Sequence, residues 1–168
     1  MMTVAGTSLI WSPRSNISRY GDTVHIAEVA RLSVNIALGT WLPSGSSNML
    51  RELACADSFN QTYQGGYLTD QQLWMMVTAN AAAVVHMSDV IGTLAPGHVA
   101  DISIFATSTA ANPARAVIAA QPQDVALVMR GGTALFGDQA VVDALATGCD
   151  AVSVCDSAKS ACVSSESP

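Results

Sequence analysis

Short apolar runs alternate with a helix-like stretch over the first 40 residues. Residues 7–11 form an apolar run that ends at a Ser-Pro pair, which predicts a buried strand. The polar residues 12–21 predict a loop, and Asp22 is a suitable N-cap for a helix over residues 23–32. A second apolar run at Val34–Leu38 predicts the next strand. The order strand, helix, strand implies a parallel pair joined by a right-handed crossover.

A parallel pair of strands needs neighbours, because two strands cannot close a sheet or bury both of its faces. The first predicted strand lies almost at the start of the sequence. We therefore expect the remaining strands to come from elsewhere or to be missing, and we expect the chain to be marginally stable by itself.

The middle of the chain is predicted to be helical. Apolar spacing indicates a helix over residues 49–56 and a short one over residues 81–85. Between them, Thr69 and Gln72 occupy the reciprocal positions of a capping box, which opens a helix through residue 77.

Beyond residue 90 the pattern changes to turns and strands. Gly92 and the Pro96-Gly97 pair are turn residues. A Gly131-Gly132 pair between two apolar runs predicts a β-hairpin. The elements expected here are strands at 101–105, 125–129 and 133–136, followed by a short helix at 141–146 closed by Gly148.

Three of the four cysteines lie near the end of the sequence. The spacing of Cys149, Cys155 and Cys162 fits no zinc template, because CxxC pairs are absent. Two interpretations stay open: three free thiols in a loose tail, or one disulfide, which would imply an oxidising compartment. From Ser153 onward the residues are small and polar, and we expect the tail to fray. Cys55 is expected to be a small buried residue.

Composition excludes several classes of function. Half of the 168 residues are apolar and 12% are charged, which is typical of a globular piece of something larger or of a subunit with a large interface. The net charge of -6, without a basic patch, argues against nucleic-acid binding. No apolar run reaches the roughly 18 residues of a membrane span. The absence of a basic n-region favours a cytoplasmic location, whereas a disulfide in the tail would favour an extracytoplasmic one.

Three segments carry a recognisable set of motifs. The first has a Pro-x-Ser-Asn stretch after a strand, and the second an Ile-Ala-Leu-Gly-Thr strand end. The third has a Gly-x-Leu-x-x-Gly-x-x-Ala-Asp-Ile run after a Thr-x-Asn helix. These segments cover residues 11–22, 36–53 and 78–102. Together they resemble the metal-dependent amidohydrolase superfamily, in particular its deaminase and imidazolonepropionase-like branch, over about residues 4–136.

The resemblance implies an α/β fold: the C-terminal portion of a (β/α)8 barrel plus part of the flanking composite β-sandwich domain. It implies that residues 1–88 are the end of the barrel, with its seventh and eighth strands. Residues 89–138 would be part of the composite β-domain, and residues 139–168 a short helix and a cysteine-containing tail.

The resemblance also implies hydrolysis of a non-peptide carbon–nitrogen bond in a cyclic amide, amidine or aminated heterocycle. In the complete family member, zinc or iron activates water. The family's ligands are a His-x-His pair on the first strand, further histidines, and an Asp at the end of the eighth strand. This chain has no His-x-His, and Thr40 is followed directly by Trp41 where the family has an Asp between them. His25, His86 and His98 lack ligand spacing. We therefore expect no catalytic residue and no metal or other cofactor in this chain alone.

The resemblance places the substrate-binding candidates Trp11, Arg14 and Asn16 after the seventh strand, on the face where barrel enzymes bind substrate. Arg14 is suited to a carboxylate or polarised carbonyl and Asn16 to an amide. Each has the alternative of being a structural or solvated loop residue. Arg19 departs from the family, which usually has an apolar residue there. Asp101 is expected to accept a hydrogen bond from a turn.

Two hypotheses follow. In the first, the chain is an incomplete or inactive part of a hydrolase of small amides or heterocycles, acting with an N-terminal barrel partner. In the second, it is a non-catalytic structural or oligomerisation module derived from an amidohydrolase, whose sheet edge and apolar helices form a homo-oligomer.

Overall fold

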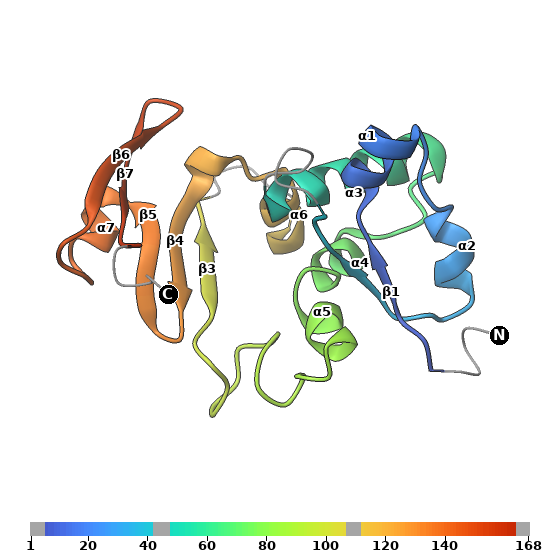
Figure 1. Ribbon diagram of the computed structural model, residues 1–168, viewed down its shortest axis with the longest axis horizontal. Helices are drawn as coiled ribbons and strands as arrows, with labels where there is room; N and C mark the ends of the chain where they lie inside the picture. Colours follow the sequence, from blue (N-terminus) through green and yellow to red (C-terminus); the bar gives the residue numbers. More distant parts are fainter. Residues whose placement is uncertain (1–5, 42–47, 107–111, 164–168) are drawn as a thin grey trace.

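The computed structural model describes residues 6–41, 48–106 and 112–163. Its strands form two separate sheets, one of two strands and one of five. Figure 1 shows the small sheet and helices α1 to α3 at one end of the molecule and the larger sheet at the other end. Helices α4, α5 and α6 lie between the two sheets (Figure 1).

The small sheet confirms the predicted parallel pair. Strand β1 (Leu9–Trp11) pairs with β2 (Ile36–Leu38), with Trp11 opposite Leu38. All three residues of β2 are buried, as expected of a strand covered on both faces. The crossover between the two strands contains α1 (Pro13–Tyr20) and α2 (Ile26–Arg31).

The outer edge of β2 is covered by helical segments. The amide of Leu38 donates a hydrogen bond of 2.9 Å to the carbonyl of Met76, and the side-chain amide of Asn80 donates one of 3.0 Å to the carbonyl of Ile36. These contacts satisfy polar backbone groups that a third strand would otherwise pair. The edge of this strand is therefore less exposed than expected for a lone parallel pair.

The five-stranded sheet has the order β3-β4-β5-β7-β6 and is antiparallel throughout. The predicted hairpin on Gly131-Gly132 is confirmed, and the carboxylate of Asp101 accepts the expected turn hydrogen bond from the amide of Gly131 at 2.8 Å. The strands are β3 (Ile102–Phe105), β4 (Val125–Arg130), β5 (Thr133–Asp138), β6 (Asp150–Val154) and β7 (Ser157–Ala161).

The remaining helices follow the predicted order with different lengths. The capping box of Thr69 and Gln72 is present, with both reciprocal hydrogen bonds. The helix predicted over residues 49–56 continues to Tyr63, and one helix that we did not predict begins at Pro113. The helices are α3 (Met49–Tyr63), α4 (Asp70–Met75), α5 (Ala79–Val84), α6 (Pro113–Ala119) and α7 (Gln139–Val142), with a 3-10 turn at Pro122–Asp124.

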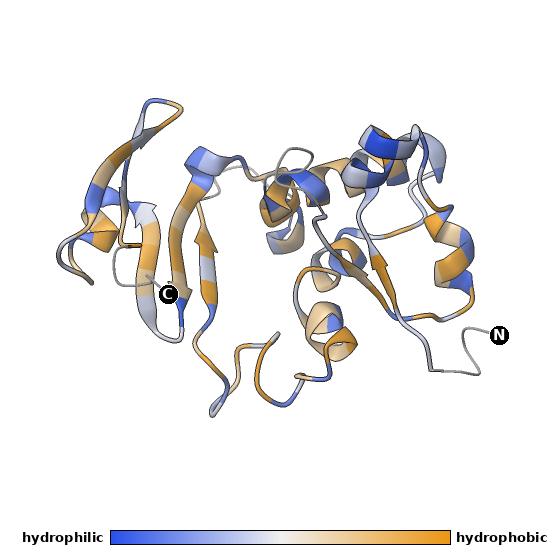
Figure 2. Ribbon diagram, in the orientation of Figure 1, coloured by the Kyte–Doolittle hydropathy of each residue, from blue (hydrophilic) through white to orange (hydrophobic). Residues whose placement is uncertain are grey.

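The loop predicted over residues 12–21 is wrong, because this segment contains α1. Pro13 occupies the first turn of the helix, where its fixed φ angle and missing N–H are tolerated, and Gly21 ends the helix with φ 75°. Figure 2 shows that α1 is mainly hydrophilic. The segment therefore lacked the apolar periodicity from which a helix is usually predicted.

The start predicted for the next helix is also wrong. Asp22 accepts a hydrogen bond from the amide of its neighbour Thr23 at 2.8 Å, and α2 begins only at Ile26, after His25. Short polar side chains often form such local turns in place of a cap.

The tail does not fray over the part that the structure describes. Strands β6 and β7 form a hairpin that joins the larger sheet through β5. Cys149 and Cys162 form a disulfide, so the disulfide alternative is the one found, while Cys155 is free and exposed. The small polar residues of this segment show no strand pattern in the sequence. The segment nevertheless forms strands, because β7 pairs with β5 and β6 pairs with β7. Cys55 is only half-buried, so its expected burial is wrong.

Two hydrophobic clusters hold the two ends of the molecule. The first packs around β1, β2 and α3, and the second lies under α7 in the larger sheet. The first comprises Trp11, Ile26, Ile36, Leu38, Leu53, Ala56, Leu68, Leu73, Met76 and Ile118, and the second Leu127, Ala134, Val142 and Cys162.

A charged cluster joins α3, α4 and α6. The guanidinium of Arg115 donates to the carboxylate of Asp57 at 2.6 Å and also pairs with Asp70, which accepts a further hydrogen bond from Asn112 at 3.1 Å. The hydrogen bond from Arg115 lowers the pKa of Asp70 below 3.8. The stability from this pair is therefore present at neutral pH and is lost as the pH falls through that lowered pKa.

We predict that Arg115→Gln lowers the free energy of unfolding by about 1 kcal/mol at pH 7, the upper range for a pair that is not fully buried. Urea unfolding of both proteins from about pH 5 to about pH 2 checks this, because the difference should shrink as the carboxylate of Asp70 is protonated. A difference that stays constant over this range would contradict the assignment.

Candidate substrate-binding site

The candidate site is formed at the carboxyl ends of β1 and β2, which lie side by side. The amide of Gly39, just past β2, donates to the carbonyl of Trp11 at 2.9 Å. Helix α1 starts immediately after β1, and Trp41 lies two residues beyond Gly39. Residues after both strands are thus brought to one edge of the parallel sheet (Figure 1).

A buried carboxylate fixes the start of α1. Glu52, on α3, is 0% exposed and accepts hydrogen bonds from the amides of Arg14 and Ser15 at 3.0 and 3.3 Å. It also accepts one from the hydroxyl of Ser15 at 2.9 Å, and that hydroxyl oxygen in turn accepts one from the amide of Trp41 at 3.4 Å. The amides of a first helical turn have no partner inside the helix, so a carboxylate there satisfies them and favours the helix dipole. Glu52 therefore links the segments that follow both strands.

Two of the predicted site residues are connected through a third residue. The indole Nε1 of Trp11 donates to the hydroxyl of Thr23 at 2.9 Å, and this hydroxyl donates to the side-chain oxygen of Asn16 at 3.3 Å. Trp11 is 1% exposed and also contacts the ring of Phe59 edge-on at 6.0 Å between centroids. Substrate contact by Trp11 and Asn16 stays a prediction, and the geometry shows that Thr23 orients both side chains.

Arg14 lies half-buried beside α3. Its Nη1 atom is buried and has no hydrogen-bond partner among the residues that the structure describes. Burial and the nearby carboxylate of Glu52 raise the pKa of the Cys55 thiol, while the positive charge of Arg14 acts in the opposite direction. The guanidinium thus retains donor capacity close to the strand ends, and its role in binding substrate stays a prediction.

An exposed group of three side chains lies at the other end of α1. The rings of Tyr20 and Trp41 stack with centroids 6.5 Å apart and an angle of 17° between their planes. The guanidinium carbon of Arg19 lies 4.5 Å from the ring centroid of Trp41 and 5.8 Å from that of Tyr20. In the sequence Arg19 stands out only as a departure from the family, and no local pattern predicts this group.

The described residues do not fit a metal site. In residues 6–41, 48–106 and 112–163, no three His, Cys, Asp or Glu side chains gather so that they could hold an ion. His25 precedes α2, His86 follows α5 with φ 58°, and His98 shares a hydrogen bond of 3.2 Å with Thr93. The donors required for a metal ion therefore do not converge in this part of the chain.

A helix that crosses a bilayer needs about 20 consecutive, predominantly apolar residues. None of the helices in the described part of the chain combines the length and the apolar character needed to cross a bilayer.

Residues 8–135 match the model of the amidohydrolase family. The chain is 29% identical over 106 residues to the 5-methylthioadenosine/S-adenosylhomocysteine deaminase of Teredinibacter turnerae. The aligned region is 61% of this chain and 24% of that protein. The deaminase of the same name from Clostridium tetani is 27% identical over 104 residues, 60% of this chain and 24% of that protein. The chain thus spans about a quarter of the length of the curated relatives that it matches.

Solved structures share the fold. An adenosine deaminase from Xanthomonas campestris with bound zinc has a TM-score of 0.70 at 21% identity, over 83% of this chain and 36% of that one. Guanine deaminase from Escherichia coli has a TM-score of 0.68 at 21% identity, over 79% of this chain and 35% of that one. Atrazine chlorohydrolase from Arthrobacter aurescens, complexed with zinc, has a TM-score of 0.65 at 20% identity, over 79% of this chain and 32% of that one.

Proposed function

Because the chain belongs to the amidohydrolase family, we propose that it forms the substrate-binding end of a hydrolase that cleaves a non-peptide carbon–nitrogen bond. The bond would lie in a cyclic amide, an amidine or an aminated heterocycle. We further propose that residues 1–88 belong to the barrel, residues 89–138 to the composite β-domain, and residues 139–168 to an appended element.

The observation that carries this proposal is the meeting of the two strand ends. Barrel enzymes bind substrate at the carboxyl ends of their parallel strands. Trp11 is the last residue of β1, Arg14 and Asn16 follow on α1, and the buried Glu52 fixes this helix. In this proposal Arg14 binds an anionic or carbonyl group of the substrate, and Asn16 orients an amide.

The names of the relatives support an aminated heterocycle as substrate. Two are deaminases of 5-methylthioadenosine and S-adenosylhomocysteine, and two structural neighbours are adenosine and guanine deaminases. The zinc bound in two of the structural neighbours supports a metal in the complete protein. Since the described residues of this chain do not fit a metal site, we assign them binding and orientation and no hydrolytic step.

A chimera tests this proposal. Residues 8–135 replace the segment of the Teredinibacter turnerae deaminase that they match, either unchanged or with Asp inserted between Thr40 and Trp41. We expect the version with Asp to release ammonia from 5-methylthioadenosine, and the unchanged version to be at least about 100-fold slower, because a proton-transferring group is missing. A folded chimera that is inactive even with the inserted Asp would contradict a competent substrate-binding end.

The alternative is a non-catalytic structural or oligomerisation module. It is favoured by the lack of converging metal donors in the described residues and by exposed apolar side chains such as Leu94, which is 81% exposed. Light scattering tests the alternative, because it requires the 168-residue chain to form a stable homo-oligomer, whereas the enzyme proposal does not.

A further inference from the structure

We propose that Tyr20, Trp41 and Arg19 form a stacking platform for a planar heterocycle that carries a carbonyl or other acceptor at its edge. This inference rests on the proposed function and names the part of the substrate that the same site would hold. The three residues are called the aromatic platform below.

The aromatic rings of the platform are unusually exposed for their size. Tyr20 is 64% exposed and Trp41 is 51% exposed, although both have large apolar faces that a protein normally buries. They are nevertheless held nearly parallel to each other, 17° between planes. Two ordered, solvent-facing aromatic rings provide a surface on which a flat ring can stack with little loss of side-chain freedom.

The platform is fixed to the frame of the candidate site. The amide of Trp41 donates to the hydroxyl of Ser15, which is hydrogen-bonded to the buried Glu52. Tyr20 and Arg19 form the last turn of α1, whose first turn is held by the same Glu52. The backbone of Trp41 and helix α1 are therefore held by the same buried carboxylate that lies beside Arg14, one of the residues proposed to bind the substrate.

The guanidinium of Arg19 determines which edge of the stacked heterocycle faces the protein. Its guanidinium lies over the Trp41 ring at 4.5 Å, and no carboxylate within the described ranges forms an ion pair with it. A guanidinium packed on an indole keeps its N–H donors in a plane, directed toward groups beside the ring. These donors match a carbonyl or anionic acceptor at the edge of a stacked heterocycle.

Binding of inosine to the 168-residue chain tests this inference without any bond cleavage. Inosine has a planar purine and a 6-oxo acceptor but no exocyclic amine to remove. We expect saturable quenching of tryptophan fluorescence by inosine and none by ribose. Trp41→Leu and Tyr20→Leu should each weaken inosine binding about 10-fold, as expected for loss of one stacking partner. Trp74→Phe, which alters a tryptophan outside the platform, should leave the affinity unchanged.

Arg19→Gln tests the edge contact separately. We expect it to weaken binding of inosine more than that of purine riboside, which lacks the 6-oxo group. Equal inosine affinity in the native chain and in Trp41→Leu, or no binding of inosine at all, would overturn the platform. Circular dichroism of each variant ensures that a lost affinity does not reflect unfolding. An inactive chimera together with intact, Trp41-dependent inosine binding would refute the hydrolase proposal and leave the platform standing.

Discussion

Glu52→Ala is expected to lower the free energy of unfolding by about 3 kcal/mol or more, which is a large part of the total for a small domain. The substitution leaves the amides of Arg14 and Ser15 and the hydroxyl of Ser15 without their acceptor in a buried environment. Each unsatisfied buried donor costs about 1–3 kcal/mol, although water entering the site would reduce the sum. Urea unfolding followed by circular dichroism measures the loss.

Two further variants make the Glu52 prediction specific. Glu28→Ala removes an exposed carboxylate from the first turn of α2 and should change stability by less than about 0.5 kcal/mol. Glu52→Gln keeps one acceptor oxygen and should lie between the native chain and Glu52→Ala. A loss below about 1 kcal/mol in Glu52→Ala would mean that α1 is not held by this carboxylate.

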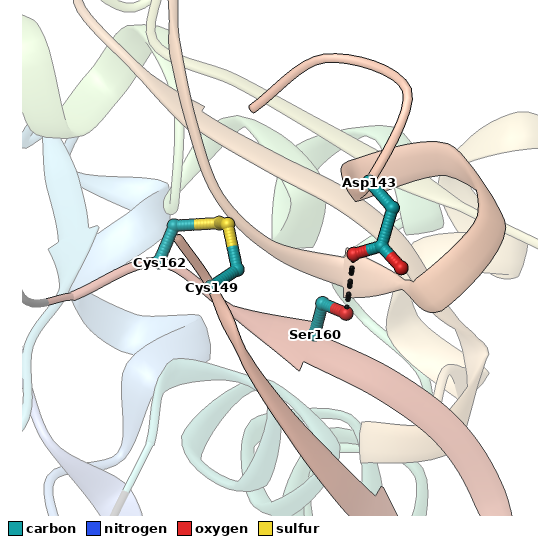
Figure 3. The surroundings of a disulfide bond; sticks show 4 residues. All are labelled: Asp143, Cys149, Ser160 and Cys162. Atoms are coloured by element: carbon teal, nitrogen blue, oxygen red, sulfur yellow. Dashed lines mark hydrogen bonds between the residues drawn. A yellow bond between two sulfur atoms is a disulfide. The ribbon is translucent and has the colours of Figure 1, made fainter. Parts of the chain in front are cut away.

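Removal of the disulfide by Cys149→Ser and Cys162→Ser is expected to lower the free energy of unfolding of the larger sheet by about 3 kcal/mol. The bond joins residues 13 apart in sequence, and Cys162 is itself a member of the buried cluster under α7. Figure 3 shows the disulfide together with the 2.8 Å hydrogen bond from the hydroxyl of Ser160 to Asp143, which ties β7 to the turn after α7.

Hydrogen exchange of the β6 and β7 amides measures the effect of the disulfide. Exchange should accelerate in the double variant while the amides of β1 and β2 stay protected. Cys155→Ser is the matched control, because Cys155 is free, exposed and at the tip of the same hairpin. Unchanged protection of β7 in the double variant would show that strand pairing alone holds the hairpin.

Elements with strong local patterns were predictable from the sequence. The strands β1 and β2, the capping box at Thr69 and the hairpin at Gly131-Gly132 all follow from local hydrophobic periodicity and turn chemistry. The predicted burial holds for β2 but not for β1, in which Ile10 is 58% exposed. The polar helix α1 and the hairpin of β6 and β7 were missed, because their order comes from tertiary partners. Glu52 stabilises α1 from 37 residues away, a contact that no local pattern reveals.

The contacts around the candidate site residues could not be predicted from the sequence. The resemblance pointed to Trp11, Arg14 and Asn16; the structure has Trp11 as the last residue of β1 and Arg14 and Asn16 on α1, and their contact with substrate stays a prediction. The hydrogen bonds through Thr23 and the stacking of Tyr20 on Trp41 depend on residues brought together by the crossover. Such contacts join segments that are far apart in sequence, so spacing alone does not predict them.

We propose that this chain binds and orients substrate but does not by itself contain the group that hydrolyses it. The most direct measurement is ammonia release from 5-methylthioadenosine by the purified 168-residue chain, together with its content of tightly bound zinc and iron. We predict less than stoichiometric metal and no ammonia above the rate without protein. Stoichiometric metal bound by His25, His86 or His98, with sustained ammonia release, would contradict the claim.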